Sequence, residues 1–311
     1  MISVLTFHAV TDGDWFEDLI CWLKRRYRLV PIDIVSRFYT DVTDVGHACH
    51  ITVDDGDRSF ADIIFPTLVR HNVPASLFVS PKMCVENRNF WFQEIKGYRE
   101  STLRSILATV VNVPIVLLTH FSVDSILKTL PLHQINEVIR RYQESTGTTE
   151  KARQNISVCA LKEIAASGLV TIGAHTMSHP ILSNEDDATC EDEIARSVRD
   201  LSTLLGRPIR HFAYPNGIPG VDLGEREALV LRNAGIRMAF TTESRHLSAT
   251  DNELRIPRLG VSDMETTRFV TAKMLLGSNW NRLKTIVGTG EDVERRRLSR
   301  ALRCFRDSVT N

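Results

Sequence analysis

The sequence carries no excess of charge of either sign. Lysine and arginine together number 38, as do aspartate and glutamate, so the formal net charge at pH 7 is zero. Proteins that bind nucleic acid or acidic polymers over a broad surface are usually strongly basic. The balance gives no such signal, and we expect no nucleic-acid partner.

Cysteine is scarce and scattered. The six cysteines form no C-x-x-C pair and lie at positions 21, 49, 84, 159, 190 and 304. A zinc ribbon needs closely spaced pairs, and a disulfide-stabilised secreted domain needs a denser framework. Several of these positions fall in apolar or helical patterns, which indicates reduced, buried thiols.

Long apolar runs are also absent. No stretch of 18 apolar residues occurs, whereas a membrane-spanning helix needs about 20. Residues 1–8 lack the basic start and the cleavage site of a secretory signal and have the pattern of a buried strand. We therefore expect a cytoplasmic protein.

What the 311 residues do contain is a repeated alternation of strand-like and helix-like segments. Apolar runs predict strands at residues 3–7, 48–53, 75–80, 170–172, 210–213 and 237–241. Helical periodicity predicts helices at 16–26, 60–69, 161–166 and 222–234, and a long helix that Ser183 caps and Gly206 ends. This order predicts a parallel sheet, and functional groups at successive strand ends favour a barrel.

Residues 85–157 interrupt the alternation. Apolar residues recur there at helical spacing, which predicts a mainly helical insertion between two strands. The insertion either packs as a cap or forms a lid or wall of a substrate site, and the sequence leaves both open.

Asp54, Asp55 and Gly56 follow the apolar run at residues 51–53. Neighbouring side chains of an extended chain point to opposite sides, so both carboxylates reach one site only where the strand ends and the chain turns. Glycine permits such a turn. Two close carboxylates repel each other, and a divalent cation is the usual way to offset that repulsion.

Two histidines supply further candidate ligands. His175 and His179 follow the apolar run at residues 169–172, and they reach one ion if the chain turns once between them. With one carboxylate they make a set of ligands that leaves coordination positions open for water and substrate. A third turn, Tyr214-Pro215-Asn216, follows the short strand at residues 210–213.

These three segments, in this order, resemble the polysaccharide deacetylases, also known as the NodB-like carbohydrate esterase family 4. That family carries the motifs T-F-D-D-G, H-[ST]-x-x-H and a form of R-x-P-Y-G. Here residues 52–56 read T-V-D-D-G, residues 175–179 read H-T-M-S-H, and residues 212–217 read F-A-Y-P-N-G. The resemblance spans about residues 1–262 with one long insertion, and it implies a distorted (β/α) barrel of about seven strands.

The resemblance also implies roles for individual residues. Asp54 is expected to be the catalytic base, while Asp55, His175 and His179 hold the metal. A backbone N–H near Tyr214, Pro215 and Asn216 is expected to stabilise the oxyanion.

Two family features are missing from their usual places. The arginine that orients the catalytic aspartate is replaced by Ala213, and Arg258 is the candidate to supply that guanidinium from elsewhere. The late leucine-x-histidine motif that supplies a general acid is not visible. His8, at the end of the first strand, is better placed than His246 to take its part, although a structural role for His8 is equally compatible with the sequence.

The function implied is the metal-dependent hydrolysis of an N-acyl group, in the first place acetyl, from an amino sugar of a glycan or glycan precursor. Zinc is the expected metal, with cobalt or nickel as alternatives. Two other functions stay open: a catalytically silent carbohydrate-binding or scaffold protein, and a deformylase of lipid-linked amino sugars.

The C-terminal extension, residues 263–311, is expected to be helical and basic. Residues 264–311 hold ten basic and five acidic side chains. Leu298, Leu302 and Phe305 would share one face of a helix among arginines. Such a helix either lies on an anionic membrane surface or docks onto the protein with its basic side in solvent. The oligomeric state is not indicated.

Overall fold

One curled sheet of parallel strands forms the centre of the molecule. The structure, a computed structural model, describes residues 2–40, 46–277 and 291–310. The sheet has eight strands in the order β7-β6-β5-β4-β3-β1-β8, with β2 pairing with β3. The strands are β1 (Ile2–Phe7), β2 (Arg28–Leu29), β3 (Ala48–Val53), β4 (Ala75–Val79), β5 (Val170–Ala174), β6 (His211–Ala213), β7 (Met238–Phe240) and β8 (Leu259–Gly260). A bridge between Phe240 and Ile256 brings the two ends of the sheet toward each other. The predicted fold class, a distorted barrel of parallel strands, is confirmed.

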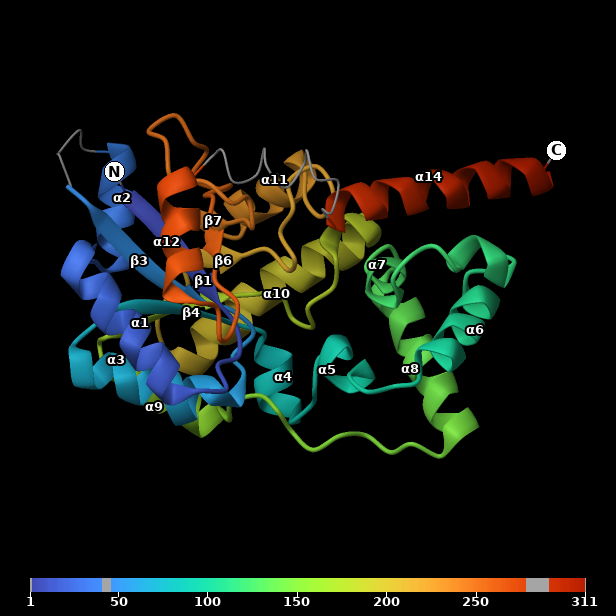
Figure 1. Cartoon of the computed structure of the whole chain (residues 1–311), viewed down its shortest axis with the longest axis horizontal. Helices are drawn as coiled ribbons and strands as arrows, with labels where there is room; N and C mark the ends of the chain where they lie inside the picture. The colour runs from blue at the N-terminus through green and yellow to red at the C-terminus, as the bar shows by residue number, and fades with distance from the viewer. Residues whose placement is uncertain (1, 41–45, 278–290, 311) are drawn as a thin grey trace.

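Helices cover the outside of this sheet (Figure 1). They are α1 (Gly13–Arg26), α2 (Ile32–Thr40), α3 (Phe65–His71), α9 (Val158–Ala166), α10 (Asp187–Leu205), α11 (Glu225–Asn233) and α12 (Thr267–Leu276). Every residue of β1 and β3 is buried. Parallel strands covered on both faces need apolar side chains in both directions, which explains why they form continuous apolar runs in the sequence.

The long helix begins three residues later than the sequence indicates. Ser183 lies in the short 3-10 turn η3 (Leu182–Asn184), and its hydroxyl donates to the carbonyl of Val221. Asp186 is the N-cap instead, because its side chain accepts the N–H of Thr189 at 2.7 Å. Both residue types cap helices well, and the tertiary contact of Ser183 decides between them.

The insertion at residues 85–157 is helical and contains no sheet strand. It comprises the end of α4 (Pro81–Glu86), then α5 (Trp91–Ile95), α6 (Glu100–Val110), the 3-10 turn η2 (Ile115–Leu118), α7 (Val123–Leu127) and α8 (Leu132–Thr146). These helices enclose a hydrophobic cluster of their own, separate from the two clusters around the sheet.

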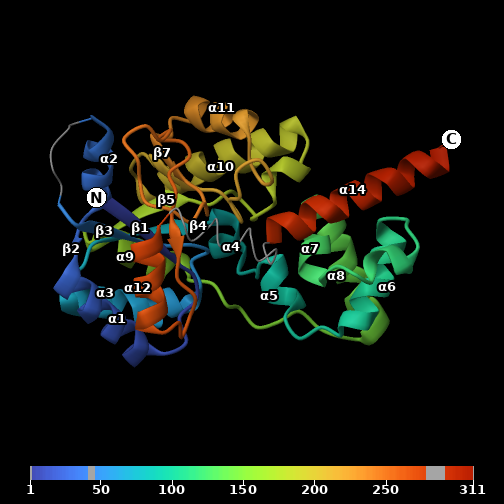
Figure 2. The same cartoon turned by 45° about the horizontal axis from the view of Figure 1, so that its top comes forward.

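The C-terminal helix α14 (Glu291–Thr310) docks on this insertion, as both views show (Figures 1 and 2). Leu298 and Leu302 are buried in the insertion's cluster, and Phe305 packs against it. The apolar face predicted for membrane contact is therefore covered by protein. Membrane contact stays a prediction that now depends on the arginines alone. Arg282 and Lys284 lie outside the described residues, as does the side chain of Arg306.

Within the described ranges, the helices are all too short or too polar to cross a lipid bilayer. The division into a barrel at residues 1–262 and an extension at 263–311 stays a prediction.

Candidate active site

A tight turn at the end of β3 places the two aspartates. Asp54 still donates its backbone N–H to Phe7 of β1 at 3.0 Å, while Asp55 and Gly56 have left-handed φ angles of 71° and 69°. A Cβ atom on Gly56 would also lie 2.9 Å from the side chain of Val79. Both the φ angle and the close approach require glycine, so the turn predicted from the sequence depends on this residue.

The histidine segment follows β5, which lies two strands away from β3. His179 has a left-handed φ of 61°, and its backbone N–H is accepted by the hydroxyl of Thr176 at 2.9 Å. Glu193 of α10 holds the same loop, because its carboxylate accepts the N–H groups of Met177 and Ser178, each at 2.9 Å. The loop is thus fixed by hydrogen bonds from both sides.

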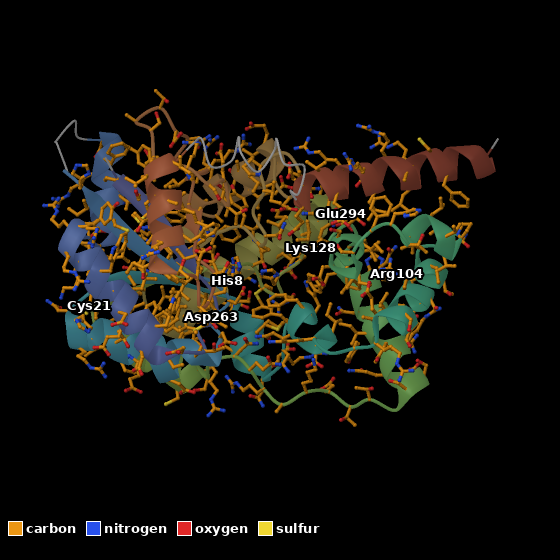
Figure 3. The ribbon with its side chains drawn as sticks, in the orientation of Figure 1. His8, Cys21, Arg104, Lys128, Asp263 and Glu294 are labelled. Atoms are coloured by element: carbon orange, nitrogen blue, oxygen red, sulfur yellow. The ribbon has the colours of Figure 1, made fainter. Side chains whose placement is uncertain are left out.

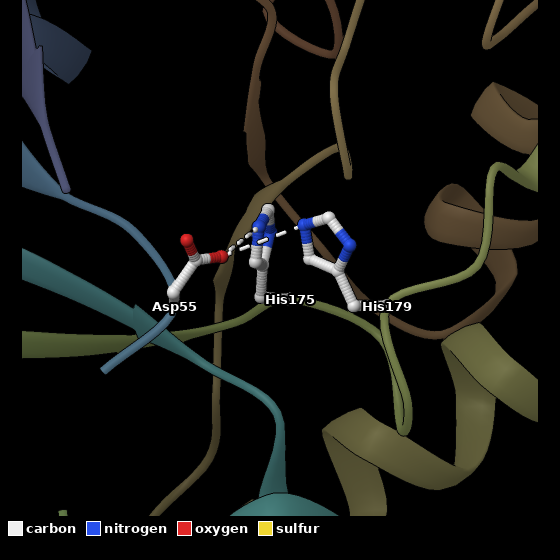
Figure 4. A group of neighbouring side chains, drawn as sticks. All are labelled: Asp55, His175 and His179. Atoms are coloured by element: carbon white, nitrogen blue, oxygen red, sulfur yellow. Dashed lines mark ion pairs between the residues drawn. The ribbon is translucent and has the colours of Figure 1, made fainter. Parts of the chain in front are cut away.

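Asp55, His175 and His179 converge on one point (Figure 4). Asp55 Oδ1 lies 3.4 Å from Nε2 of each histidine, and all three side chains are buried. His175 Nδ1 lies 2.7 Å from the carbonyl oxygen of Ala213, which can only accept, so Nδ1 carries a proton and Nε2 is the ring nitrogen that faces Asp55. The proposed metal ligands therefore come together with their donor atoms facing each other.

This donor set fits a divalent cation. Asp55 Oδ1 is buried and has no hydrogen-bond partner among the described residues. Burial lowers the pKa of His179 to about 3, which keeps its ring neutral and able to ligate. Ligand atoms arranged tetrahedrally at ordinary zinc bond lengths lie about 3.3 Å apart. The separations of 3.4 Å between Asp55 Oδ1 and the Nε2 atom of each histidine match that spacing, and the three ligand atoms all lie within 4.8 Å of one another.

Asp54 is held apart from this group by Arg258. The two guanidinium Nη atoms donate to the two carboxylate oxygens at 2.8 and 2.7 Å, and neither side chain is exposed by more than 3%. Arg258 also donates through Nε to the carbonyl of Thr241 at 3.0 Å. Burial by itself would raise the pKa of Asp54, but the charge and hydrogen bonds of Arg258 bring that pKa below its ordinary value. Asp54 is thus an oriented carboxylate that stays ionised.

The residues predicted for the oxyanion site differ in whether they have a backbone N–H that can donate to substrate. Tyr214 donates its N–H to Phe240 and its hydroxyl to Leu254, and Pro215 has no N–H. The N–H of Asn216 has no acceptor within the described part of the chain, and Asn216 lines the cavity beside His179. Of the three residues predicted to supply a backbone donor, Asn216 is therefore the one whose N–H can serve.

Two adjoining cavities meet at the site. One, of about 600 Å³, is lined by Asp55 and His179 together with Trp91, Phe92 and Lys128 of the insertion. The other, of about 720 Å³, reaches Asp54, His175 and the first turns of α14. His8 is exposed and lines both. The insertion thus forms a wall of the cavity, which favours the substrate-wall interpretation over a cap that only packs.

Sequence reasoning missed two buried acids that support the site. Glu193 lies on the buried face of α10, three residues after Cys190 and four before Ser197. A glutamate on the buried face of a predicted helix was the feature of the sequence that could have identified it. Asp222 was assigned to a helix that in fact begins at Glu225. Its carboxylate accepts the side-chain amide of Asn216 at 2.6 Å and thereby fixes the turn after β6.

We expect Glu193→Ala to destabilise the protein, because two backbone N–H groups and the hydroxyl of Ser178 lose their buried acceptor. The expected loss is about 2–4 kcal/mol in the free energy of unfolding, measured by urea denaturation. Glu191→Ala on the exposed face of the same helix is the matched control, with a change within about 0.5 kcal/mol. Equal stability of the two variants would contradict this role.

Comparison with known proteins identifies the family. The profile described as Polysaccharide deacetylase matches residues 42–239, which is more than half of the chain. The chain therefore belongs to the polysaccharide deacetylase family. No curated protein matches the sequence significantly.

Solved structures show the same fold at low sequence identity. IcaB from Ammonifex degensii is 18% identical, with 84% of this chain and 91% of that chain covered and a TM-score of 0.57. The deacetylase PplD from Streptococcus pyogenes is 14% identical, with 88% and 97% covered and a TM-score of 0.60. A de-N-acetylase from Aggregatibacter actinomycetemcomitans is 15% identical, with 88% and 99% covered and a TM-score of 0.58.

Proposed function

We propose that this chain is a metal-dependent hydrolase that removes an N-acyl group, in the first place acetyl, from an amino sugar of a glycan or glycan precursor. Membership of the polysaccharide deacetylase family supports the reaction class. The observation that carries the proposal is that two adjacent aspartates have different partners. Asp55 faces His175 and His179, while Asp54 is held away from them by Arg258.

Asp55, His175 and His179 would hold one divalent cation, with zinc first and cobalt or nickel as alternatives. The bound cation would supply Lewis acidity, polarising the acyl oxygen and lowering the pKa of water. The donor set of two imidazoles and one carboxylate leaves positions for both.

Residues around the three proposed metal ligands would carry out the proton transfers and stabilise the oxyanion. Asp54 takes the proton of the attacking water, and Arg258 keeps its carboxylate ionised and in a single orientation. The N–H of Asn216, which donates to no described residue, donates to the developing oxyanion. His8, which lines both cavities, gives a proton to the leaving amine.

The alternative of a silent carbohydrate-binding protein rested on two missing features, the arginine at position 213 and the histidine that supplies a general acid. Arg258 makes the contact with the catalytic aspartate from a different part of the chain, which supports the enzymatic function. A cytoplasmic site of action on a glycan precursor, lipid-linked precursors included, stays part of the proposal.

A panel of substrates tests this function. We expect release of acetate from N-acetylated amino sugars, sugar oligomers or lipid-linked sugars, lost on chelation and restored by adding zinc. Formylated counterparts in the same panel separate a deacetylase from a deformylase. Sugar binding without any acyl release, in protein with a full complement of metal, would favour the silent binding protein instead.

A further inference from the structure

A groove lined by arginines lies next to the catalytic cavity. It has a volume of about 400 Å³ and runs between α14 and the loops that carry Thr129, Asn184 and Gly220. That volume is in the range of ligand-binding sites. Four arginines line it, at positions 295, 296, 300 and 303, and no carboxylate does so among the described residues.

Three of these arginines form no ion pair with a side chain that the structure describes. Arg295 is buried and pairs with Asp222 at 2.5 Å. The three are Arg296, Arg300 and Arg303, and all of them are exposed. Three guanidinium groups of like charge on one wall repel each other, and an anion bound between them would remove that repulsion.

The placement of these arginines follows from how α14 docks. Residues 296, 300 and 303 are spaced by four and three, so they share one face of the helix, while Leu298 and Leu302 are buried on another. Glu294 accepts the backbone N–H of Ser122 at 2.7 Å and fixes the start of α14 against α7, near Lys128 (Figure 3). The arginine face is thus held over the groove by contacts on the opposite side of the helix.

The groove connects with the catalytic cavity through Arg296, which lines both. Arg296 lies against the loop after β6, because a Cβ atom on Gly220 would be 4.0 Å from its Nη2. The same loop carries Asn216, the proposed oxyanion donor. A ligand that reaches from the metal ligands into the groove would therefore present its anionic end to the arginines.

We propose that this groove binds a phosphate or diphosphate group carried by the amino-sugar substrate. The inference rests on the proposed function and deepens it by naming the substrate class, a phosphorylated or diphosphate-linked N-acylated amino sugar. Guanidinium groups bind phosphate oxygens through paired hydrogen bonds, and several arginines match the multiple charge of a diphosphate.

Binding of inorganic diphosphate to the full-length, metal-loaded protein, measured by calorimetry, is the first test. We expect binding that Arg300→Glu weakens about tenfold or more, since it removes one charge-assisted contact and adds repulsion. Arg297→Glu is the matched control, because Arg297 is exposed on the same helix, carries the same charge change and does not line the groove. It should change affinity by less than about twofold. No binding of diphosphate, or equal effects of the two variants, would overturn the proposal.

Competing ligands separate the sources of negative charge. Phosphatidylglycerol vesicles, compared with phosphatidylcholine vesicles, report on an anionic lipid surface. If vesicles bound in a way that depends on Arg300 and diphosphate did not bind, the ligand of the groove would be a lipid surface and not a substrate phosphate. Tighter binding of a polyuronate than of diphosphate would overturn the assignment in favour of carboxylates.

Turnover distinguishes this inference from the proposed function. An N-acetylated amino sugar bearing a 1-phosphate should have a kcat/KM about tenfold above its neutral counterpart, and Arg300→Glu should abolish the difference while hydrolysis of the neutral sugar continues. Equal turnover of both sugars by the unmodified protein would refute the phosphate groove but not the hydrolase. Arg300-dependent diphosphate binding without hydrolysis of any sugar would refute the hydrolase and leave an anion site.

Discussion

Asp54→Asn should retain the metal and lose about 10²- to 10⁴-fold in turnover, because an amide cannot accept the proton of the attacking water. Asp54 does not belong to the group of three residues that would hold the cation, so the metal content should stay at that of the unmodified protein. Elemental analysis of the purified variant and acetate release from the best substrate of the panel measure the two quantities.

The same change also disturbs the charge balance of the core. Arg258 is fully buried and would lose the charge of its partner, which is expected to lower the free energy of unfolding by about 3 kcal/mol. Near-ultraviolet circular dichroism at the assay temperature therefore has to show that the variant is folded. Asp62→Asn, at an exposed position, controls for loss of a carboxylate elsewhere. If Asp54→Asn lost the metal as thoroughly as Asp55→Asn, the roles assigned to the two aspartates would be wrong.

His179→Ala should lose most of the metal, with an affinity reduced at least about 100-fold, which is the upper range for removing even an indirect supporting contact. The protein as purified should carry about one divalent ion per chain, since Asp55, His175 and His179 form one group. Dialysis against a competing chelator, followed by elemental analysis, compares the affinities.

His120→Ala is the control for the metal experiment, because His120 is exposed in the insertion and far in sequence from the site. It should retain the metal content and the activity of the unmodified protein. Full retention of metal by His179→Ala would contradict the assignment of the ligands and, with it, the proposed chemistry. Zinc added to the His179→Ala protein should restore little activity, whereas zinc added to chelated unmodified protein should restore most of it.

Most of the sheet could be predicted from the sequence because buried parallel strands impose a local pattern. β3 was predicted at residues 48–53 and lies at Ala48–Val53, and it ends where Asp54 and Asp55 begin. Gly206 was predicted to end the long helix, and it adopts a left-handed φ angle of 64° just after Leu205. Strands β2 and β8 were not predicted, since two residues are too few for a periodic pattern.

The sequence by itself determined which residues could do chemistry, because turns with glycine or proline after apolar runs bring carboxylates and imidazoles to one end of a sheet. The sequence offered Arg258 only as a candidate, and the tertiary structure decided that this residue, 204 residues away in the chain, is the partner of Asp54. It also decided that the apolar face of α14 is covered by the insertion, so that its arginines face a groove. An amphipathic helix looks the same in sequence whether protein or lipid covers it, and a buried ion pair between distant residues leaves no local pattern, because both depend on contacts that form only when the chain folds.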